Sequence, residues 1–122
     1  MQDSQHPPVF DPGPFNGLME VGGPELIQEL CELFLTDTPG IIDELEAAVQ
    51  SEDWETMGRA AHSLKSSAFY LGALALSNLA KTIEHYAQED PQAGAALATE
   101  PRRAFAEVTG ALTKACQELP PV

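Results

Sequence analysis

The chain contains 122 residues, of which 43% are hydrophobic and 20% are charged, and its 19 acidic and 6 basic residues give a formal net charge of −13. This length supports one modest hydrophobic core and excludes a two-domain protein. The acidic excess excludes nucleic acid and anionic membranes as expected partners, because both are bound mainly through lysine and arginine. No apolar run approaches the roughly 18 residues of a membrane span, and the N-terminus lacks the features of a signal peptide, so we expect a cytoplasmic location.

The first stretch of the chain predicts a tail and then a short helix. Residues 1–8 are polar and contain two prolines, which is typical of a flexible terminus. Asp11 precedes Pro12, a pattern that starts helices, but the glycines that follow limit any helix within 9–20 to one or two turns. The Gly-Gly-Pro sequence at 22–24 then predicts a break.

Two amphipathic helices are expected next. Apolar residues recur at helical spacing within 25–37, which predicts the first main helix. Thr38 stands directly before Pro39, a pair that favours a new helix start. We therefore expect Thr38 to cap a second helix that ends near Gln50.

The third and fourth helices are expected on either side of a tight turn. The third should start after a cap at Ser51 or Asp53 and end near Leu71. Gly72 follows and suits the left-handed position that closes many helices. The fourth helix is expected over 73–88, where an apolar stripe recurs at helical spacing.

The C-terminal third of the chain predicts an interrupted helix. Pro91 can begin a helix, but Pro101 would destabilise that helix by ~3 kcal/mol if it lay in the helix interior. We therefore expect a break near Thr99, which can cap a final helix that runs through Cys116. No strand-like alternation of any length is present in the sequence.

These elements predict an all-α fold, an antiparallel four-helix bundle with a short additional N-terminal helix. The domain should span 9–118, between the tail at 1–8 and a second tail at 119–122. The two cysteines, Cys31 and Cys116, lie in apolar helical patterns. They are expected to be small buried thiols, because no Cys-x-x-Cys or other metal-ligand spacing is present.

His62 is the most informative residue of the sequence. When successive residues are placed about 100° apart around the third helix, mostly apolar residues gather on the side opposite His62, which predicts a core face there. An imidazole that points into solvent from mid-helix gains nothing from packing, and it titrates near neutrality, which suits proton or phosphoryl chemistry. The alternative is an ordinary surface histidine. The predicted core face consists of Met57, Ala60, Ala61, Leu64, Ser67, Ala68 and Leu71.

Glu84 is the candidate partner of His62. His62 lies nine residues before Leu71, and Glu84 lies twelve residues after Gly72, so at 1.5 Å per residue both sit roughly 15 Å from the same bend. A carboxylate at that height could accept the Nδ1 proton and leave Nε2 as a nucleophile. The alternative is that Glu84 is one surface acid among many.

The sequence AHSLKSSAFYLGA at 61–73 resembles the signature of histidine-containing phosphotransfer domains, the HPt family of two-component phosphorelays. That signature reads approximately A-H-x-L-K-G-S-x-x-x-[LI]-G, and L-x-x-L-E follows it on the next helix. With the helix order on both sides, the resemblance covers about residues 9–118. The corresponding residues are Ala61, His62, Leu64, Lys65, Ser67, Leu71 and Gly72, and then Leu79, Ile83 and Glu84.

The resemblance implies a role for three residues. His62 would be phosphorylated, and Glu84 would orient its imidazole ring. Lys65, one helical turn from His62, would balance the charge of the phosphoryl group.

A docking face around His62 is expected as well. Gly58 leaves room for a partner, Arg59 adds positive charge, and Phe69 offers an aromatic anchor, unless Phe69 instead packs against the first short helix.

Ser66 stands where the family usually has glycine. Its hydroxyl could bond to a phosphoryl oxygen, so we expect slower or more selective transfer rather than its loss.

The implied function is that of a phosphoryl carrier and not of an enzyme. His62 would accept the phosphoryl group from a receiver-domain aspartate and pass it to another receiver, in a response regulator or a hybrid histidine kinase. The chain contains no G-x-x-x-x-G-K-[ST] sequence, so no ATP site and no cofactor of its own is expected, and the receiver would supply Mg²⁺.

Two alternatives remain open. The chain could be a phosphotransfer module that a histidine kinase phosphorylates in trans, or a structural or inhibitory bundle that binds a partner without phosphorylation. A metal site formed by His62, Glu84 and His85 is not expected, because adjacent helical residues point about 100° apart.

Overall fold

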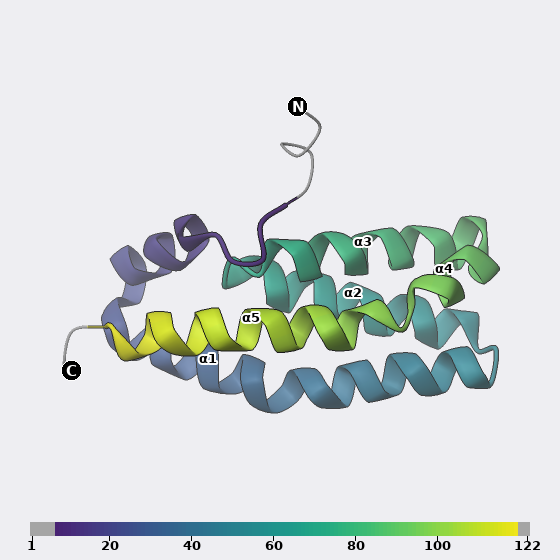
Figure 1. The fold of residues 1–122 in the computed structure, drawn as a ribbon, viewed down its shortest axis with the longest axis horizontal. Helices are drawn as coiled ribbons and strands as arrows, with labels where there is room; N and C mark the ends of the chain where they lie inside the picture. The colour runs from purple at the N-terminus through teal and green to yellow at the C-terminus, as the bar shows by residue number, and fades with distance from the viewer. Residues whose placement is uncertain (1–6, 120–122) are drawn as a thin grey trace.

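A computed structural model describes residues 7–119, and all of the regular structure within that range is helical. Successive long helices run in opposite directions and pack as an antiparallel bundle, with α4 linking α3 to α5 (Figure 1). The predicted fold class is confirmed. The helices are α1 (Pro12–Gln50), α2 (Trp54–Tyr70), α3 (Leu74–Glu89), α4 (Pro91–Leu97) and α5 (Glu100–Gln117).

The core is built from the apolar stripes of the four long helices. One cluster of buried side chains joins α1, α2, α3 and α5, and a second joins α1 to α2 and α3 near α4. The predicted core face of α2 is confirmed, because all of its apolar members are buried and Ser67 is half-buried. His62, on the opposite side, is exposed.

The predicted break at Thr38 is wrong, because α1 continues through Pro39. Proline lacks the N–H that would bond to the carbonyl one turn earlier, which normally ends a helix. Here the buried positions of α1 keep helical spacing on both sides of the proline, so one continuous stripe faces the core. Thr38 belongs to that stripe, and its hydroxyl has no hydrogen-bond partner among the described residues. The stripe consists of Ile27, Cys31, Phe34, Thr38, Ile42, Leu45 and Ala48.

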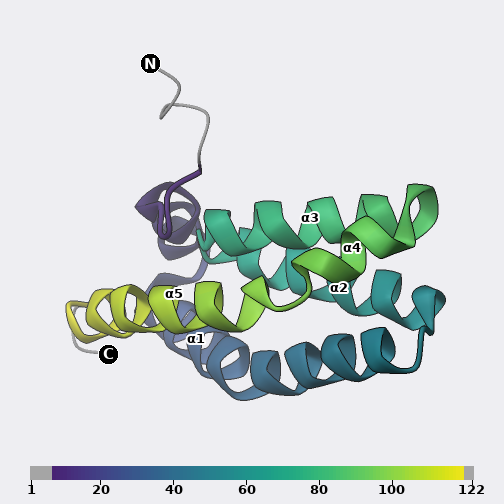
Figure 2. The ribbon, with the colours of Figure 1, turned by 45° about the vertical axis from the view of Figure 1, so that its right-hand side comes forward.

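The predicted break at 22–24 is confirmed as a kink within α1. Gly23 has φ 71° and ψ −169° there, a backbone conformation open to glycine and strained for other residues. The turns before the kink lie across the end of the bundle where α2 turns into α3 (Figure 2). They form the predicted short N-terminal helix, which at 12–22 is longer than the one or two turns expected. The Asp11 carboxylate caps it and accepts from the backbone N–H of Gly13 at 2.9 Å.

The segment before this helix is bonded to the α2–α3 turn. The backbone N–H of Asp11 donates to the Gly72 carbonyl at 2.7 Å, and that of Ala75 donates to the Pro8 carbonyl at 2.9 Å. The predicted domain start at residue 9 stays a prediction, because residues 1–6 lie outside the described residues. At the other end, Leu119 packs against the core, and 120–122 also lie outside them.

The other helix ends follow from local sequence. Asp53, rather than Ser51, caps α2 and accepts from the Thr56 N–H at 3.2 Å. Pro101 lies in the first turn of α5, where its missing N–H needs no partner. The predicted break near Thr99 is therefore confirmed, although the Thr99 side chain makes no capping bond.

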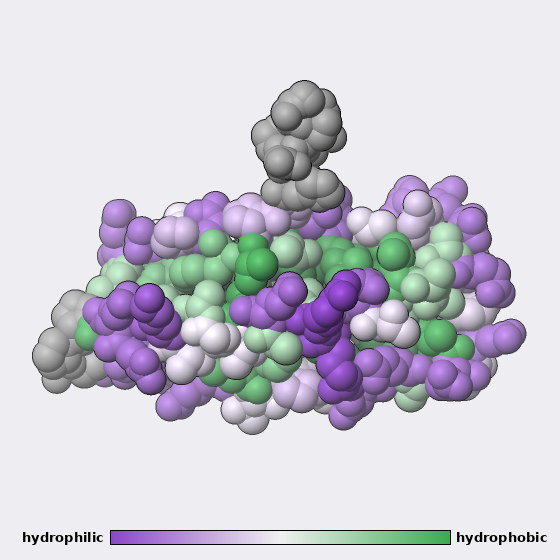
Figure 3. All heavy atoms as spheres, in the orientation of Figure 1, coloured by the Kyte–Doolittle hydropathy of each residue, from purple (hydrophilic) through white to green (hydrophobic). Residues whose placement is uncertain are grey.

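On the face seen in Figure 3, hydrophilic residues lie mostly at the edges, and an apolar band runs between α3 and α5. Between residues 7 and 119 no helix combines the length and the apolar character needed to cross a membrane.

Cys31 is buried and Cys116 half-buried, and both are free thiols. Burial and the neighbouring Cys116 thiol raise the pKa of Cys31, so Cys31 behaves as a small apolar side chain, as predicted.

Gly72 is expected to be essential for the stability of this arrangement. It has φ 83°, and an added Cβ would lie 2.0 Å from the Asp11 carbonyl oxygen. Gly72→Ala should lower the free energy of unfolding, measured in urea, by more than about 2 kcal/mol, since the left-handed backbone alone costs roughly 1–2 kcal/mol. Gly110→Ala, in α5 where an added Cβ has open space, is the control and should be neutral or slightly stabilising. An unchanged urea midpoint for Gly72→Ala would contradict the prediction.

Candidate functional site

His62 lies in the middle of α2, on the side that faces solvent. Its side chain is 61% exposed, while the opposite side of the helix packs against α1 and α3. The turn at Gly72 places α3 antiparallel to α2. His62 therefore stands beside the second half of α3, as the residue count from the bend predicted.

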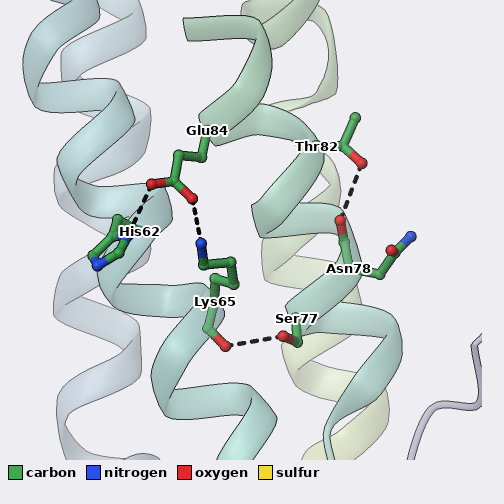
Figure 4. Close-up of polar contacts among 6 residues, drawn as sticks. All are labelled: His62, Lys65, Ser77, Asn78, Thr82 and Glu84. Carbon is green, nitrogen blue, oxygen red and sulfur yellow. Dashed lines mark hydrogen bonds and ion pairs between the residues drawn. The ribbon is translucent and has the colours of Figure 1, made fainter.

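Glu84 bridges His62 and Lys65, as Figure 4 shows. One carboxylate oxygen, Oε2, lies 2.8 Å from His62 Nδ1. The other, Oε1, accepts a hydrogen bond from Lys65 Nζ at 2.7 Å. The predicted proximity of Glu84 to His62 is confirmed. The contact between Lys65 and the carboxylate was not predicted, because the sequence does not show how a flexible lysine is oriented.

The charge of Glu84 determines the tautomer of His62. Burial by itself would raise the pKa of Glu84, but hydrogen bonds from Lys65 and His62 and their charges outweigh it and hold this pKa below its ordinary value. Glu84 is thus ionised at neutral pH and can only accept hydrogen bonds. In the neutral imidazole Nδ1 therefore carries the proton and donates it, and the Nε2 lone pair lies on the side of the ring away from Glu84 (Figure 4).

Ser77 is a site residue that the sequence analysis missed. Its hydroxyl donates to the backbone carbonyl of Lys65 at 2.9 Å, and the residue is 7% exposed. Ser77 lies seven residues before Glu84 on α3, so both side chains face α2. The bond fixes the height of α3 against α2 at the turn that carries Lys65 (Figure 4). The only available signal was a polar residue on the apolar stripe of α3.

A hollow of about 560 Å³ opens beside His62 on the N-terminal side of α2. Gly58 lies in its floor, and a Cβ at Gly58 would be 3.3 Å from the Ala87 Cβ. Gly58 thus allows α2 and α3 to approach closely, in addition to leaving space beside His62. The lining residues are Trp54, Glu55, Gly58, Arg59, His62, Ser63, Glu84, Ala87 and Gln88.

A second hollow, of about 320 Å³, lies on the other side of Lys65. Ser66 is half-buried in its wall, and Phe69 is 55% exposed at its rim. The alternative that Phe69 packs against the short N-terminal helix is wrong, because its ring instead meets that of the exposed Tyr70 edge-on at 6.2 Å. Lys81 also lines this hollow.

Comparison with known proteins assigns the chain to a family. The sequence profile of the Hpt domain matches residues 29–120, more than half of the chain and the whole of the site. The chain belongs to the Hpt family. No curated protein sequence matches the chain significantly.

The fold of this Hpt protein is similar to that of a solved relative. The crystal structure of histidine-containing phosphotransfer protein B (HptB) from Pseudomonas aeruginosa PAO1 matches with a TM-score of 0.83 and 28% sequence identity. The match covers 93% of this chain and 98% of the relative. Histidine phosphotransfer within a phosphorelay is therefore the function of this Hpt protein. Hpt domains are phosphoryl carriers rather than catalysts, and their partners are receiver domains and histidine kinases.

His85, next to Glu84 in sequence, is exposed, and its ring lies near that of Tyr86. Among residues 7–119, no group of three or more His, Cys, Asp or Glu side chains is placed to hold a metal ion.

The stabilising contribution of Glu84 is expected to depend on pH. Because its pKa is lowered by folding, this contribution is complete above the ordinary pKa of the unfolded carboxyl and is lost as the pH falls through the lower folded value. Glu84→Gln should therefore reduce the free energy of unfolding by up to about 1 kcal/mol at pH 7. The difference from the parent should vanish in acid, where both side chains are neutral.

Urea unfolding between pH 7 and acid conditions measures this difference. The matched control is Glu44→Gln, which changes an exposed acid on α1 and should have the same small effect at every pH. A Glu84→Gln effect that is constant with pH would show that the ionised carboxylate does not stabilise the fold.

Proposed function

We propose that His62 is the residue that carries the phosphoryl group and that Nε2 is the atom to which it is bonded. The observation that carries this proposal is the 2.8 Å contact between Nδ1 and the Glu84 carboxylate. A neutral imidazole with its Nδ1 proton held in that bond presents an unprotonated Nε2 to solvent. The exposed side chain gives the phosphoryl donor free access to that atom.

The same contact supports the bond-forming step. Nε2 attacks the phosphorus of a receiver aspartyl phosphate, the Nε2–P bond forms, and the P–O bond to the aspartate breaks as its carboxylate leaves. The ring gains positive charge in this step, and the adjacent Glu84 carboxylate balances it. The reverse step passes the phosphoryl group to the aspartate of a second receiver.

Lys65 is proposed to balance phosphoryl charge from one helical turn away. It is 30% exposed and is bonded to Glu84 in the unphosphorylated protein. Its hydrogen bond there holds the Glu84 carboxylate in place and contributes to the lowered pKa of that carboxyl, which maintains the orientation of His62. We take residues 9–118 as the phosphotransfer domain that holds these three residues.

The proposed partners are receiver domains of response regulators or hybrid histidine kinases. The receiver brings the aspartate and the Mg²⁺ bound beside it, whereas this chain contributes the oriented nucleophile. No ATP site is proposed for this chain, whose sequence lacks a phosphate-binding glycine loop. The proposed docking face surrounds His62 and comprises Gly58, Arg59, Ser66 and Phe69.

Phosphotransfer assays test the role of His62. The parent protein should take up phosphate from an isolated, phosphorylated receiver domain without ATP, and His62→Gln should take up none. His85→Gln, which changes the exposed histidine on α3, is the matched control and should retain full transfer. Transfer to His62→Gln would disprove the proposal. Labelling that needs a histidine kinase and ATP, and never occurs from a receiver, would support phosphorylation in trans by a kinase instead.

The docking role of Phe69 is expected to appear in the concentration dependence of transfer. Phe69→Ala removes an exposed ring, so folding should be little affected, while the receiver concentration needed for half-maximal transfer should rise about tenfold, as for a moderate interface anchor. Val21→Ala, which changes an exposed apolar residue on the short N-terminal helix, is the control and should transfer normally. Equal concentration dependence in the two variants would remove Phe69 from the docking face.

A further inference from the structure

The positive charge of Lys65 is already compensated in the unphosphorylated protein. Its ammonium lies 2.7 Å from Glu84 Oε1, in a half-buried position between α2 and α3. A phosphoryl group on Nε2 would lie on the opposite side of the imidazole ring from Glu84, because Nδ1 faces that carboxylate (Figure 4). A phosphoryl group there carries more negative charge than this partly compensated lysine balances, so a second cation beside it would stabilise the group.

Arg59 is placed to supply that charge. It lies three residues before His62 on α2, hence on the same face and one turn away. Helical side chains generally lean toward the N-terminus, which is the side of His62 on which Arg59 lies. Both residues line the hollow of about 560 Å³, and of the described residues in that lining, Arg59 is the only one with a permanent positive charge.

The existing partners of Arg59 hold it loosely. Its side chain is 69% exposed, and its guanidinium lies 3.9 Å from the Glu55 carboxylate. A second contact is a 3.3 Å hydrogen bond to the Thr56 hydroxyl. Both partners precede Arg59 on the exposed surface of α2, so exchanging them for a phosphoryl group buries no charge and breaks no core contact.

We propose that Arg59 binds the phosphoryl oxygens of phosphorylated His62 and is a second cation of the site. This proposal rests on His62 being the phosphorylated residue. The guanidinium fork matches two phosphoryl oxygens, which a lysine ammonium does not. The hollow over Gly58 gives the phosphoryl group space on the Arg59 side, and Arg59 acts within this chain whether or not a receiver is present.

Phosphoramidate, a small-molecule phosphoryl donor, separates this role from docking. With it, the Nε2–P bond forms, the P–N bond of the donor breaks and ammonia leaves, so no partner protein takes part. We expect Arg59→Gln to slow this phosphorylation roughly fivefold to tenfold, as for the loss of one ordinary hydrogen bond at an exposed site. Arg59→Lys should fall between Arg59→Gln and the parent. Arg103→Gln, a matched exposed arginine on α5 that pairs with Glu100, should react at the parent rate.

Nuclear magnetic resonance gives a direct second measurement on the phosphorylated parent protein. The guanidinium resonances of Arg59 should shift when His62 is phosphorylated and should show a proton–phosphorus correlation, whereas those of Arg103 should not move. Unshifted Arg59 resonances, or a phosphoramidate rate in Arg59→Gln within twofold of the parent, would overturn the proposal. Slower transfer from a receiver with an unchanged phosphoramidate rate would overturn it too, since Arg59 would then act only in docking.

The failure of the underlying assignment is distinguishable from the failure of this inference. If His62→Gln still gives a phosphohistidine signal with phosphoramidate, His62 is not the modified residue, and the proposed function fails whatever Arg59 does. If that signal is absent in His62→Gln and the Arg59 variants behave as the parent, only the role of Arg59 fails.

Discussion

The contact on which the site depends is the bridge that one carboxylate makes between two side chains of the neighbouring helix. Glu84 reaches from α3 to His62 and Lys65 on α2, with both distances under 3 Å. Because the carboxylate is ionised, it can only accept a hydrogen bond, so Nδ1 carries the proton of this contact and the neutral imidazole has its lone pair at Nε2. The chemistry of an exposed imidazole is thus set by a half-buried ion pair beside it.

This bridge requires α2 and α3 to be held at a fixed separation and height. Gly58 permits close approach to Ala87, and the buried Ser77 hydroxyl binds the Lys65 carbonyl. At the bend, Gly72 adopts a left-handed conformation that lets the segment around Asp11 pack directly on the turn. Core packing alone would tolerate small sliding of the two helices, whereas these polar and backbone contacts have strict distance requirements.

The surface around His62 differs from the remainder of an acidic protein. The chain carries 6 basic residues against 19 acidic ones, yet Arg59 and Lys65 lie one turn before and one turn after His62. A site that must accept a dianionic group within a protein of net charge −13 requires local positive charge to offset repulsion. The hollows on either side of Lys65 leave this part of α2 open to a partner, and the aromatic rings of Phe69 and Tyr70 stand at its edge.

The sequence by itself determined the helical bundle, the exposure of His62 and the height of Glu84, because helical periodicity and rise per residue convert spacing directly into position. It also located the kink at Gly23 and the turn at Gly72. It failed at Pro39, where local propensity predicted a helix boundary but burial of one continuous apolar stripe outweighed the lost hydrogen bond. Only the tertiary structure decided that Lys65 binds Glu84, that Ser77 holds α3 in register and that Phe69 stays exposed. Each of these depends on the orientation of a side chain relative to another helix, which residue spacing within one helix does not specify.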